Sequence, residues 1–450
     1  MTDRRDAPSV QWPDEVTGLT QALISAAPVQ SGGTRERIER LAQSTPTEFA
    51  AWWTAGRSVV DGPVDVIDFF SGCGGMSAGF RAVNGITPAF RNILAVDVDP
   101  VANATYERNL GLAPVLQDVN VLASKPKFVD SLLREGGRRI GHPLVMIGCA
   151  PCQGFSSHRK NSAPQDSRND LFEDFALIAS RLNPDFIVIE NVPELLTDRH
   201  WPRVRQVRSR LQKAGYIVHL AVHNFAEFGL PQERFRAVML AARTNFHAPA
   251  GFLGRNDFRT VRDAIGALPA VEAGVSHPAD PLHQSAGHRP STIEMIRSVP
   301  KDGGRRRFDT GPASLQALHQ RQGKPGFEDV YGRLFWDKPA ITITHYSRNP
   351  ASGRFVHPEQ DRGLTGREAA LLQGFPLDFD FAGGFDDRFR QIGNAVPPMV
   401  AAHIALTILA QLIDPPSHQI DAGVIEPVGR SVARLIPSLK TRSTESARTA

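Results

Sequence analysis

Short apolar runs recur between residues 63 and 245, and the stretches between them are long enough for one helix each. The first run starts at Val64 and passes into a glycine turn and then a helix. The later runs that we interpret as strands cover residues 93–96, 115–117, 145–147 and 186–189. Strands that alternate with helices in this way predict an α/β fold, with a mainly parallel sheet and helices on both faces.

The same pattern returns near the C-terminus and divides the chain into segments. Residues 361–415 contain two helical stretches, so we assign them to one main domain together with 63–245. Residues 246–360 are loop-rich, with many Gly and Pro, and predict a smaller domain. Residues 1–62 predict a helical extension that packs on the main domain. Residues 416–450 are rich in Ser, Thr, Arg and Pro, and we expect them to be disordered.

Glycine and aspartate residues follow the first three predicted strands. Gly72 and Gly74 let the backbone take positive φ and pass close to a ligand. Asp97 ends the second strand, where a carboxylate can accept hydrogen bonds from both hydroxyls of a ribose. Asp118 ends the third strand and could accept from an exocyclic amine. Each Asp taken singly is more often a turn or cap residue, but their placement on successive strands predicts a site for a nucleotide-like ligand.

A thiol and a carboxylate follow the next two predicted strands. Cys152 lies in a tight turn after strand 145–147, and Glu190 ends strand 186–189. A thiolate is a strong nucleophile, and a positioned carboxyl can protonate or hydrogen-bond the group it attacks. Cys149 and Cys152 form a C-x-x-C, for which a redox pair, half of a zinc site or an inert core cysteine are alternatives. Zinc lacks two further ligands at suitable spacing, so we predict covalent catalysis and no metal.

The composition of the chain argues against a secreted or membrane-spanning protein but does not point to a particular function. The chain has 450 residues, of which 41% are hydrophobic, enough for one large core and a smaller lobe. The formal charge of +4 is compatible with nucleic acid as a partner. Three cysteines fit a reducing compartment, and no apolar run in the sequence approaches membrane-spanning length. The first residues lack the apolar core of a secretory signal, so we expect a cytoplasmic protein.

Taken in order, these features resemble the cytosine-C5 DNA methyltransferase family over most of residues 64–405. The motifs that carry the resemblance are the loop 68–75, Asp97 with Asp99, Asp118, Pro151-Cys152-Gln153, 166–172, Glu190-Asn191-Val192, 228–236, 364–376 and 391–398. The resemblance implies a Rossmann-like S-adenosylmethionine-dependent methyltransferase domain formed by the main domain. It also implies that residues 246–360 are a target-recognition domain.

The resemblance assigns the methyl donor, S-adenosylmethionine, to the glycine loop and its neighbours. Phe70 would contact the adenine of the donor, Asp97 its ribose hydroxyls and Asp118 its adenine amine. Asn394 would lie near the methionine end of the donor. Gly72 and Gly74 would form the loop beneath it.

The resemblance also assigns the chemistry at the target base. The Cys152 thiolate would attack C6 of a cytosine flipped out of the duplex, which makes C5 able to accept the methyl group. Glu190 would hold the ring N3 and the exocyclic amine. Arg234 and Arg236 would anchor the base carbonyl and a neighbouring phosphate, although a solvated pair beside a strand is the alternative. The sequence does not identify the base that removes the C5 proton.

Duplex contacts are expected from the catalytic turn and from the smaller domain. The residues we expect to contact DNA are Gln153, Arg305, Arg306, Arg307 and Arg333. A solvated loop is the alternative for the three consecutive arginines. The sequence provides no rule for converting these residues into a recognised DNA sequence.

These inferences predict a DNA cytosine-5 methyltransferase in a restriction-modification system or in an unpaired marking role. Its partners would be double-stranded DNA and, functionally, a cognate restriction endonuclease; we expect a monomer in the cytoplasm, associated with the nucleoid. A tRNA cytosine-C5 methyltransferase is a close alternative, but the long, basic-leaning segment 246–360 favours duplex DNA. A catalytically silent regulator on the same fold is a further alternative, and the presence of both Cys152 and Glu190 argues against it.

Overall fold

The computed structural model describes residues 12–29, 31–150, 171–305, 311–313, 329–418, 428–429 and 431–432. Cys152, Gln153, Arg306 and Arg307 lie outside the described residues, and so does most of the expected disordered tail.

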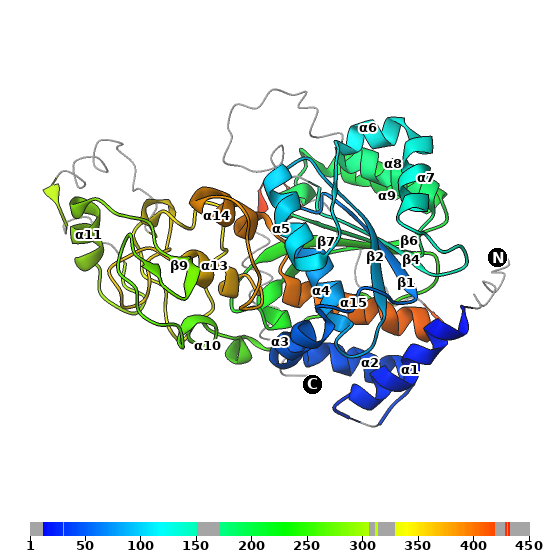
Figure 1. The fold of residues 1–450 in the computed structure, drawn as a ribbon, viewed down its shortest axis with the longest axis horizontal. Coiled ribbons are helices and arrows are strands. Elements are labelled where there is room, and N and C mark those ends of the chain that lie inside the picture. The colour runs from blue at the N-terminus through cyan, green and yellow to red at the C-terminus, as the bar shows by residue number, and fades with distance from the viewer. Residues whose placement is uncertain are drawn as a thin grey trace.

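A seven-stranded sheet forms the centre of the molecule (Figure 1). Its strands are β1 Val64–Phe69, β2 Phe90–Asp97, β3 Val115–Leu116, β4 Leu144–Gly148, β5 Phe186–Asn191, β6 Ile217–Asn224 and β7 Phe235–Ala242. The strand order is β3-β2-β1-β4-β5-β7-β6, and only β7 runs antiparallel to its neighbours. This confirms the predicted α/β fold with a mainly parallel, Rossmann-like sheet.

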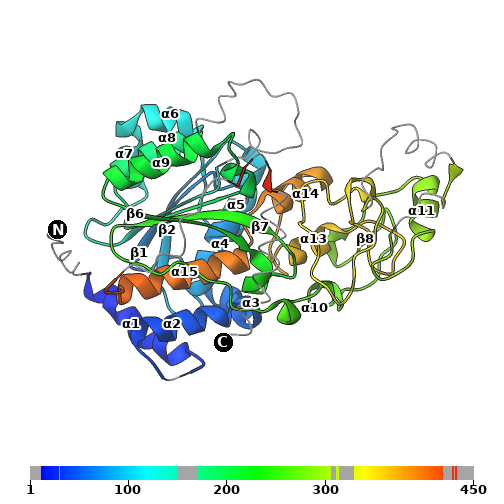
Figure 2. The same cartoon turned by 180° about the vertical axis from the view of Figure 1, so that it is seen from behind.

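Helices cover both faces of the sheet (Figures 1 and 2). One face carries α4 Gly75–Val83, α5 Pro100–Leu110 and α15 Pro398–Ile413; the other carries α6 Val119–Ser124, α7 Pro126–Glu135, α8 Leu171–Leu182 and α9 Trp201–Lys213. Neighbouring residues of one strand point to opposite faces, so Val66 joins the first of these cores and Ile67 the second. The central strands are therefore apolar on both sides.

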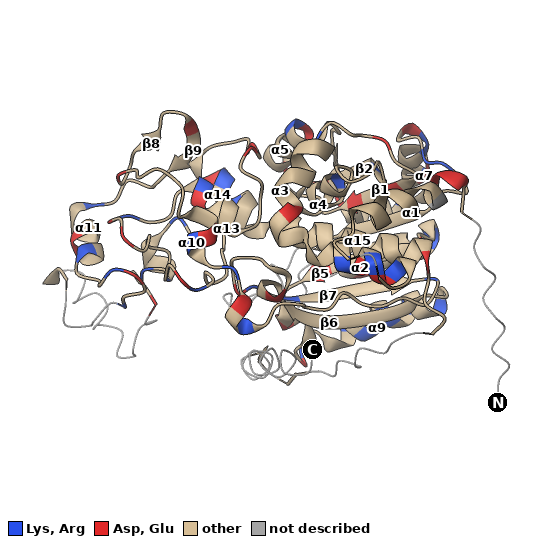
Figure 3. Ribbon diagram, turned by 90° about the horizontal axis from the view of Figure 1, so that it is seen from below, with Lys and Arg blue, Asp and Glu red and all other residues tan. Residues whose placement is uncertain are grey.

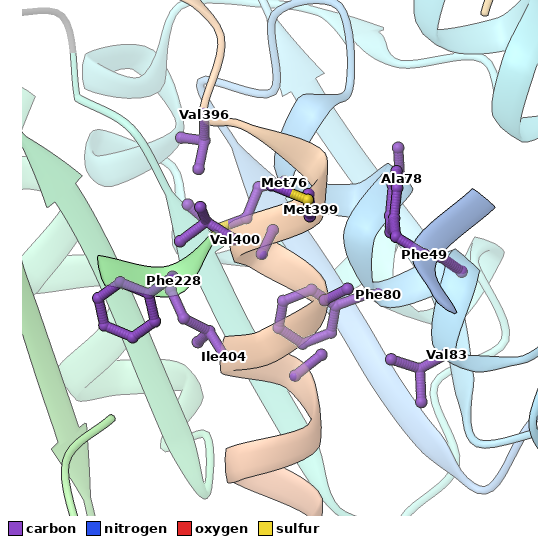
Figure 4. Close-up of a cluster of buried hydrophobic side chains, with 14 of the residues drawn as sticks. Phe49, Met76, Ala78, Phe80, Val83, Phe228, Val396, Met399, Val400 and Ile404 are labelled. Carbon is purple, nitrogen blue, oxygen red and sulfur yellow. The ribbon is translucent and has the colours of Figure 1, made fainter. Parts of the chain in front are cut away.

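Helix α15 is buried along almost its whole length. Figure 4 shows Val400 and Ile404 of this helix packed between Phe80 of α4 and Phe228. The helical stretch Phe385–Ile413 is long and apolar enough to cross a membrane by composition, but 94% of its most apolar window is buried inside the fold. Its apolar character is thus explained by its place in the core.

Three N-terminal helices form a further layer outside α15 and α4. They are α1 Asp14–Ala26, α2 Thr34–Gln43 and α3 Thr45–Gly56. The outer surface of α2 carries interspersed charges of both signs (Figure 3), while Ile38 and Leu41 face the core. Gly85 permits the close approach of α3, because a Cβ there would lie 2.0 Å from the Trp52 carbonyl oxygen. The extension is helical and packs on the main domain.

The smaller lobe is built mostly from loops. Its regular elements are η5 Arg255–Asp257, α10 Val261–Ile265, β8 Ser276–His277, β9 Asp280–Gln284, α11 Pro290–Arg297 and η6 Pro350–Ser352. Helix α13 (Gly366–Leu372) packs on α10, on β9 and on α14 (Phe385–Asn394). Residues after 361 therefore line the junction with this lobe before the chain returns to the main core in α15.

Two short 3-10 helices and part of the C-terminal segment complete the description. The 3-10 helices are η3 Pro193–Leu196 and η4 Phe225–Phe228. The Val428 N–H donates to the Leu196 carbonyl (3.1 Å), and the Asp198 N–H donates to the Gly429 carbonyl (3.1 Å). These described residues of the expected disordered tail are thus paired with the chain beside η3.

Candidate active site

The carboxyl ends of four parallel strands meet in one row. Val96 of β2 pairs with Phe69 of β1, Phe69 pairs with Gly148 of β4, and Gly148 pairs with Ile189 of β5. The residues that follow these paired positions are Asp97 for β2, Phe70 for β1, Cys149 for β4 and Glu190 for β5. Ligands of open α/β sheets bind outside this edge, so the row brings the candidate donor residues and the catalytic carboxylate to one place.

The glycine loop after β1 is held by Asp97. The Gly72 N–H donates to Asp97 Oδ2 (2.8 Å), and the Asp99 N–H donates to Asp97 Oδ1 (2.9 Å). Burial raises the pKa of Asp97 above its ordinary value. Gly72 has φ +50°, and a Cβ added to it would meet no atom within 4 Å. Glycine is used here for its backbone conformation, and the loop faces open space.

Phe70 lies at the start of the same loop. Its φ is +57°, which is rare for an aromatic residue and indicates a backbone held by its surroundings. Its ring stacks on that of Phe175, with centroids 6.4 Å apart, and it stays half-buried. One ring face can thus be offered to a planar ligand.

The segment after α14 lies against the start of α4. A Cβ on Gly75 would approach the Val396 carbonyl oxygen to 2.3 Å, so the two backbones touch. Asn394, two residues before Val396, is exposed at the end of α14. Gly74 has φ +86° and packs under the ring of Tyr106. The backbone two residues after Asn394 therefore touches the start of α4, and the expected place of Asn394 near the methionine end of the donor stays a prediction.

Three buried polar atoms near this loop accept or donate no hydrogen bond within the described part of the chain. They are Ser71 Oγ, Asn103 Oδ1 and Gln391 Oε1. The amide of Asn103 donates to the Asp97 carbonyl (3.4 Å), and the Cys73 thiol contacts the Gln391 carbonyl (3.8 Å). Unsatisfied buried polar atoms in a native fold call for a ligand or water. A ligand with amino, carboxylate and hydroxyl groups would fit this surrounding.

Asp118 caps a helix. Its Oδ1 accepts from the Asn120 N–H (3.1 Å) at the start of α6, and the side chain is half-buried. A cap uses one oxygen of the carboxylate, and the second oxygen is the one that could accept from an amine.

A chain of hydrogen bonds beneath the loop was not predicted. The Asn92 amide donates to the Tyr106 hydroxyl (3.0 Å), which donates to Ser77 Oγ (2.9 Å). Ser77 in turn donates to Asp68 Oδ2 (2.6 Å), and burial raises the pKa of Asp68 to about 7. These residues stand on four different elements, so only Asp68, at a strand end, could have been singled out from sequence.

Glu190 is 4% exposed and its two oxygens have different partners. Arg236 Nε forms an ion pair with Oε1 (2.8 Å), and the Cys149 thiol donates to Oε2 (2.9 Å). Apart from this ion pair, Oε1 has no hydrogen-bond partner among the residues that the structure describes. Glu190 and Arg236, both predicted as catalytic residues, thus lie side by side, although their ion pair was not predicted. The contact with Cys149 was not predicted, although the position of Cys149 directly after a strand was a usable signal.

Arg234 differs from the expectation that it anchors the base. It is 2% exposed, and its guanidinium donates to the carbonyls of Ile343 (3.1 Å), Gly393 (3.3 Å) and Ala395 (3.2 Å). These carbonyls belong to the smaller lobe, to the last turn of α14 and to the residue that follows it. Arg234 therefore joins protein segments through charged hydrogen bonds to their backbone oxygens.

Arg333 also differs from the expected DNA contact. It is 1% exposed and donates to the carbonyls of Ile296, Val299, His357 and Gln360 and to the Asp361 carboxylate. A guanidinium has five N–H donors, and this one uses them inside the lobe. Arg362 is similarly buried against Glu368 (2.7 Å). The guanidinium of Arg333 thus stabilises the lobe through internal hydrogen bonds. Arg305, in contrast, is exposed.

The zinc alternative gains no support from the described residues. They contain no group of three or more His, Cys, Asp or Glu side chains arranged to hold a metal ion. Burial raises the pKa of Cys73 to about 12, so this thiol is an inert core residue.

Comparisons with known proteins agree with the geometry. The sequence profile of the C-5 cytosine-specific DNA methylase family matches residues 64–410. The Type II methylase M.HgiDII of Herpetosiphon aurantiacus is 33% identical over 76% of this chain and 94% of the relative. The Type II methyltransferase M1.HphI of Haemophilus parahaemolyticus is 35% identical over 76% of this chain and 86% of the relative.

A solved structure shares the fold. It is described as a DNA modification methyltransferase of an Escherichia coli prophage, with a TM-score of 0.58 at 23% identity, over 77% of this chain and 98% of the other. The family match spans the sheet, the glycine loop and the strand end that carries Glu190. The chain therefore belongs to the C-5 cytosine-specific DNA methylase family and is a DNA cytosine-5 methyltransferase.

Proposed function

We propose that this chain methylates C5 of a cytosine flipped out of a specific sequence in double-stranded DNA, with S-adenosylmethionine as the donor and a covalent Cys152 adduct at C6. One observation carries the proposal most directly. Glu190 is buried at the edge of the sheet where the glycine loop ends, and its Oε1 is paired with Arg236 Nε (2.8 Å). A carboxylate oxygen can accept more than one donor, so an exocyclic amine of a cytosine can bind to the oxygen that Arg236 already holds.

The proposed chemistry follows from the poor reactivity of cytosine C5. Addition of the Cys152 thiolate to C6 breaks the aromaticity of the ring and makes C5 enamine-like. Glu190 binds the N3 and amine edge and offsets the charge that builds up there, and Arg236 keeps this carboxylate in place. Once C5 carries the methyl group, a base removes the C5 proton, and the thiol leaves C6. The target atom is inside the stacked duplex, so the base must first be flipped out.

S-adenosylmethionine, when bound, supplies the electrophilic methyl group. The residues that would hold it are Phe70 at the adenine, Asp97 at the ribose, Asp118 at the adenine amine and Asn394 at the methionine end. The unsatisfied atoms of Ser71, Asn103 and Gln391 support a polar ligand at this loop.

The biological setting is proposed from the relatives. Both curated relatives named above carry Type II names, which supports a role in restriction-modification. We therefore propose a cognate restriction endonuclease as a functional partner, and a monomer that acts on nucleoid DNA in the cytoplasm. Residues 246–360 would read the duplex, with Gln153, Arg305, Arg306 and Arg307 as candidate contacts.

Bisulfite sequencing of plasmid DNA from cells that express the chain tests this proposal. We expect protected cytosines at one short motif, and no protection with the empty vector or with Cys152→Ala. Methylation that survives Cys152→Ala would overturn the covalent mechanism. If plasmid DNA is unprotected while the protein binds S-adenosylmethionine, the same assay on tRNA decides whether the substrate is RNA.

A further inference from the structure

Cys149 lies where the two catalytic strand ends meet. It follows β4 directly, and its backbone neighbour Gly148 pairs with Ile189, the residue before Glu190. Its thiol is half-buried and lies 2.9 Å from Glu190 Oε2. The other oxygen of this carboxylate faces Arg236. Cys149 and Arg236 thus hold Glu190 from two sides.

We propose that Cys149 is a positioning residue for methyl transfer, acting through the hydrogen bond from its thiol to Glu190. This inference rests on the proposed role of Glu190 at the cytosine ring. A glutamate side chain has three rotatable bonds, and fixing it before the base arrives removes an entropic cost from the reaction. The S–H donor fixes Oε2, and Oε1, which Arg236 holds, can accept a further hydrogen bond from the base.

A second hydrogen bond supports this role for the same strand ends. The Asn191 amide donates to the Ala150 carbonyl (3.2 Å). Beyond the last ladder pair, the ends of β4 and β5 are therefore joined by two hydrogen bonds, this one and the one between the Cys149 and Glu190 side chains. The chain that continues from Ala150 carries Cys152 two residues later. The contact of Cys149 with Glu190 therefore joins the carboxylate to a residue that precedes Cys152 by three positions in the sequence.

A different role is conceivable for a half-buried cysteine, and it makes opposite predictions. Cys149 also packs on the edge of the main apolar core, where a thiol behaves as a small hydrophobic group. If space filling is its only role, Cys149→Val is tolerated and Cys149→Ser is harmful. If the donor matters, Cys149→Ser retains activity, and Cys149→Val loses it as Cys149→Ala does.

Single-turnover methylation of a duplex that contains the recognised motif distinguishes the two roles. We expect Cys149→Ser to react within about threefold of the wild type, and Cys149→Ala and Cys149→Val to react about tenfold more slowly, the size of effect of one lost hydrogen bond. The Kd for S-adenosylmethionine, measured by calorimetry, and the KM for DNA should stay unchanged. Circular dichroism checks that each variant folds.

A second pair of variants gives an independent readout. Threonine and valine have nearly the same shape, but only the threonine hydroxyl can donate to Glu190 Oε2, so Cys149→Thr should react about tenfold faster than Cys149→Val. If Cys149→Ser does not fold, equal rates for Cys149→Thr and Cys149→Val overturn the proposal. A rate for Cys149→Val equal to that of the wild type overturns it as well. An inactive wild type, in contrast, would contradict the proposed function itself.

Discussion

Two arginines of the same motif, Arg234 and Arg236, show how neighbouring side chains on one strand acquire different roles. Arg234 directly precedes β7, and Arg236 is the second residue of this strand. Arg236 reaches the carboxylate at the end of β5, whereas Arg234 reaches three carbonyls of more distant segments. The difference comes from what each guanidinium meets.

This difference predicts separate effects for a matched pair of variants. Arg236→Gln should lower kcat by about 100-fold while donor binding is retained, because it removes the contact with Glu190, and the other hydrogen bond of Arg236 goes only to the neighbouring Phe235 carbonyl. Arg234→Gln should lower the free energy of unfolding by about 3 kcal/mol, since buried carbonyls lose a charged donor. It should also weaken donor binding, because the Gly393–Ala395 backbone beside Asn394 is released. Urea unfolding and calorimetry measure both effects; equal donor binding by the two variants would contradict the assignment.

At the scale of elements, Asp68 and its hydrogen-bonded partners join β1, β2, α4 and α5 under the glycine loop. Asn92, Tyr106 and Ser77 each pass a hydrogen bond toward the Asp68 carboxyl. Burial of the carboxyl outweighs the hydrogen bond from Ser77, which lowers the pKa, and raises the pKa of Asp68 from 3.8 to about 7. The ionised form is therefore disfavoured in the folded protein.

A pH dependence follows from this raised pKa. Below about pH 4 the carboxyl is protonated in both folded and unfolded chains, and its contribution to stability is fully present. As pH rises through 7 that contribution is lost, by at most about 4 kcal/mol. Asp68→Asn should therefore be more stable than the wild type at pH 8, and the difference should shrink as pH falls to 5. Thermal unfolding across this range measures it, and a constant difference would argue against the raised pKa.

At the scale of the whole molecule, the N-terminal extension joins the main domain to the segment that follows α13. Trp53 of α3 is fully buried, packs on Phe379 with ring centroids 5.8 Å apart, and donates to Asp378 Oδ1 (2.8 Å). A second helix of the extension, α2, packs along α15 of the main domain. The extension lies outside the family match yet contributes to the core.

Replacement of this tryptophan tests whether the extension stabilises the enzyme as a whole. Trp53→Ala should lower the free energy of unfolding by about 3–5 kcal/mol, since it leaves a large cavity. Trp53→Phe should cost less, because most of the apolar contact remains. Leu377→Ala serves as a control, because Leu377 is 61% exposed and directly precedes Asp378, the hydrogen-bond partner of Trp53. Urea denaturation that gives the same midpoint for Trp53→Ala and Leu377→Ala would show that the extension folds independently.

The predictable part of the site consists of residues at strand ends. Asp97, the glycine loop and Glu190 could be located from sequence, because apolar runs mark the strands and parallel strands end at one edge of a sheet. Arg234 and Arg333 could not be assigned in the same way. Their partners lie 24 to 161 residues away along the chain, and an arginine reads the same in sequence whether it faces a carbonyl or a phosphate.

By itself, the sequence determined the fold class, the family and the order of the motifs, since these depend on local patterns of apolar runs, glycines and strand-end residues. Only the tertiary structure decided which guanidiniums are buried and which oxygen of Glu190 pairs with Arg236. It also decided that the thiol of Cys149 contacts the other oxygen of this carboxylate. The reason is physical: burial and hydrogen-bond partners depend on strand register and on segments that approach only when the chain is folded.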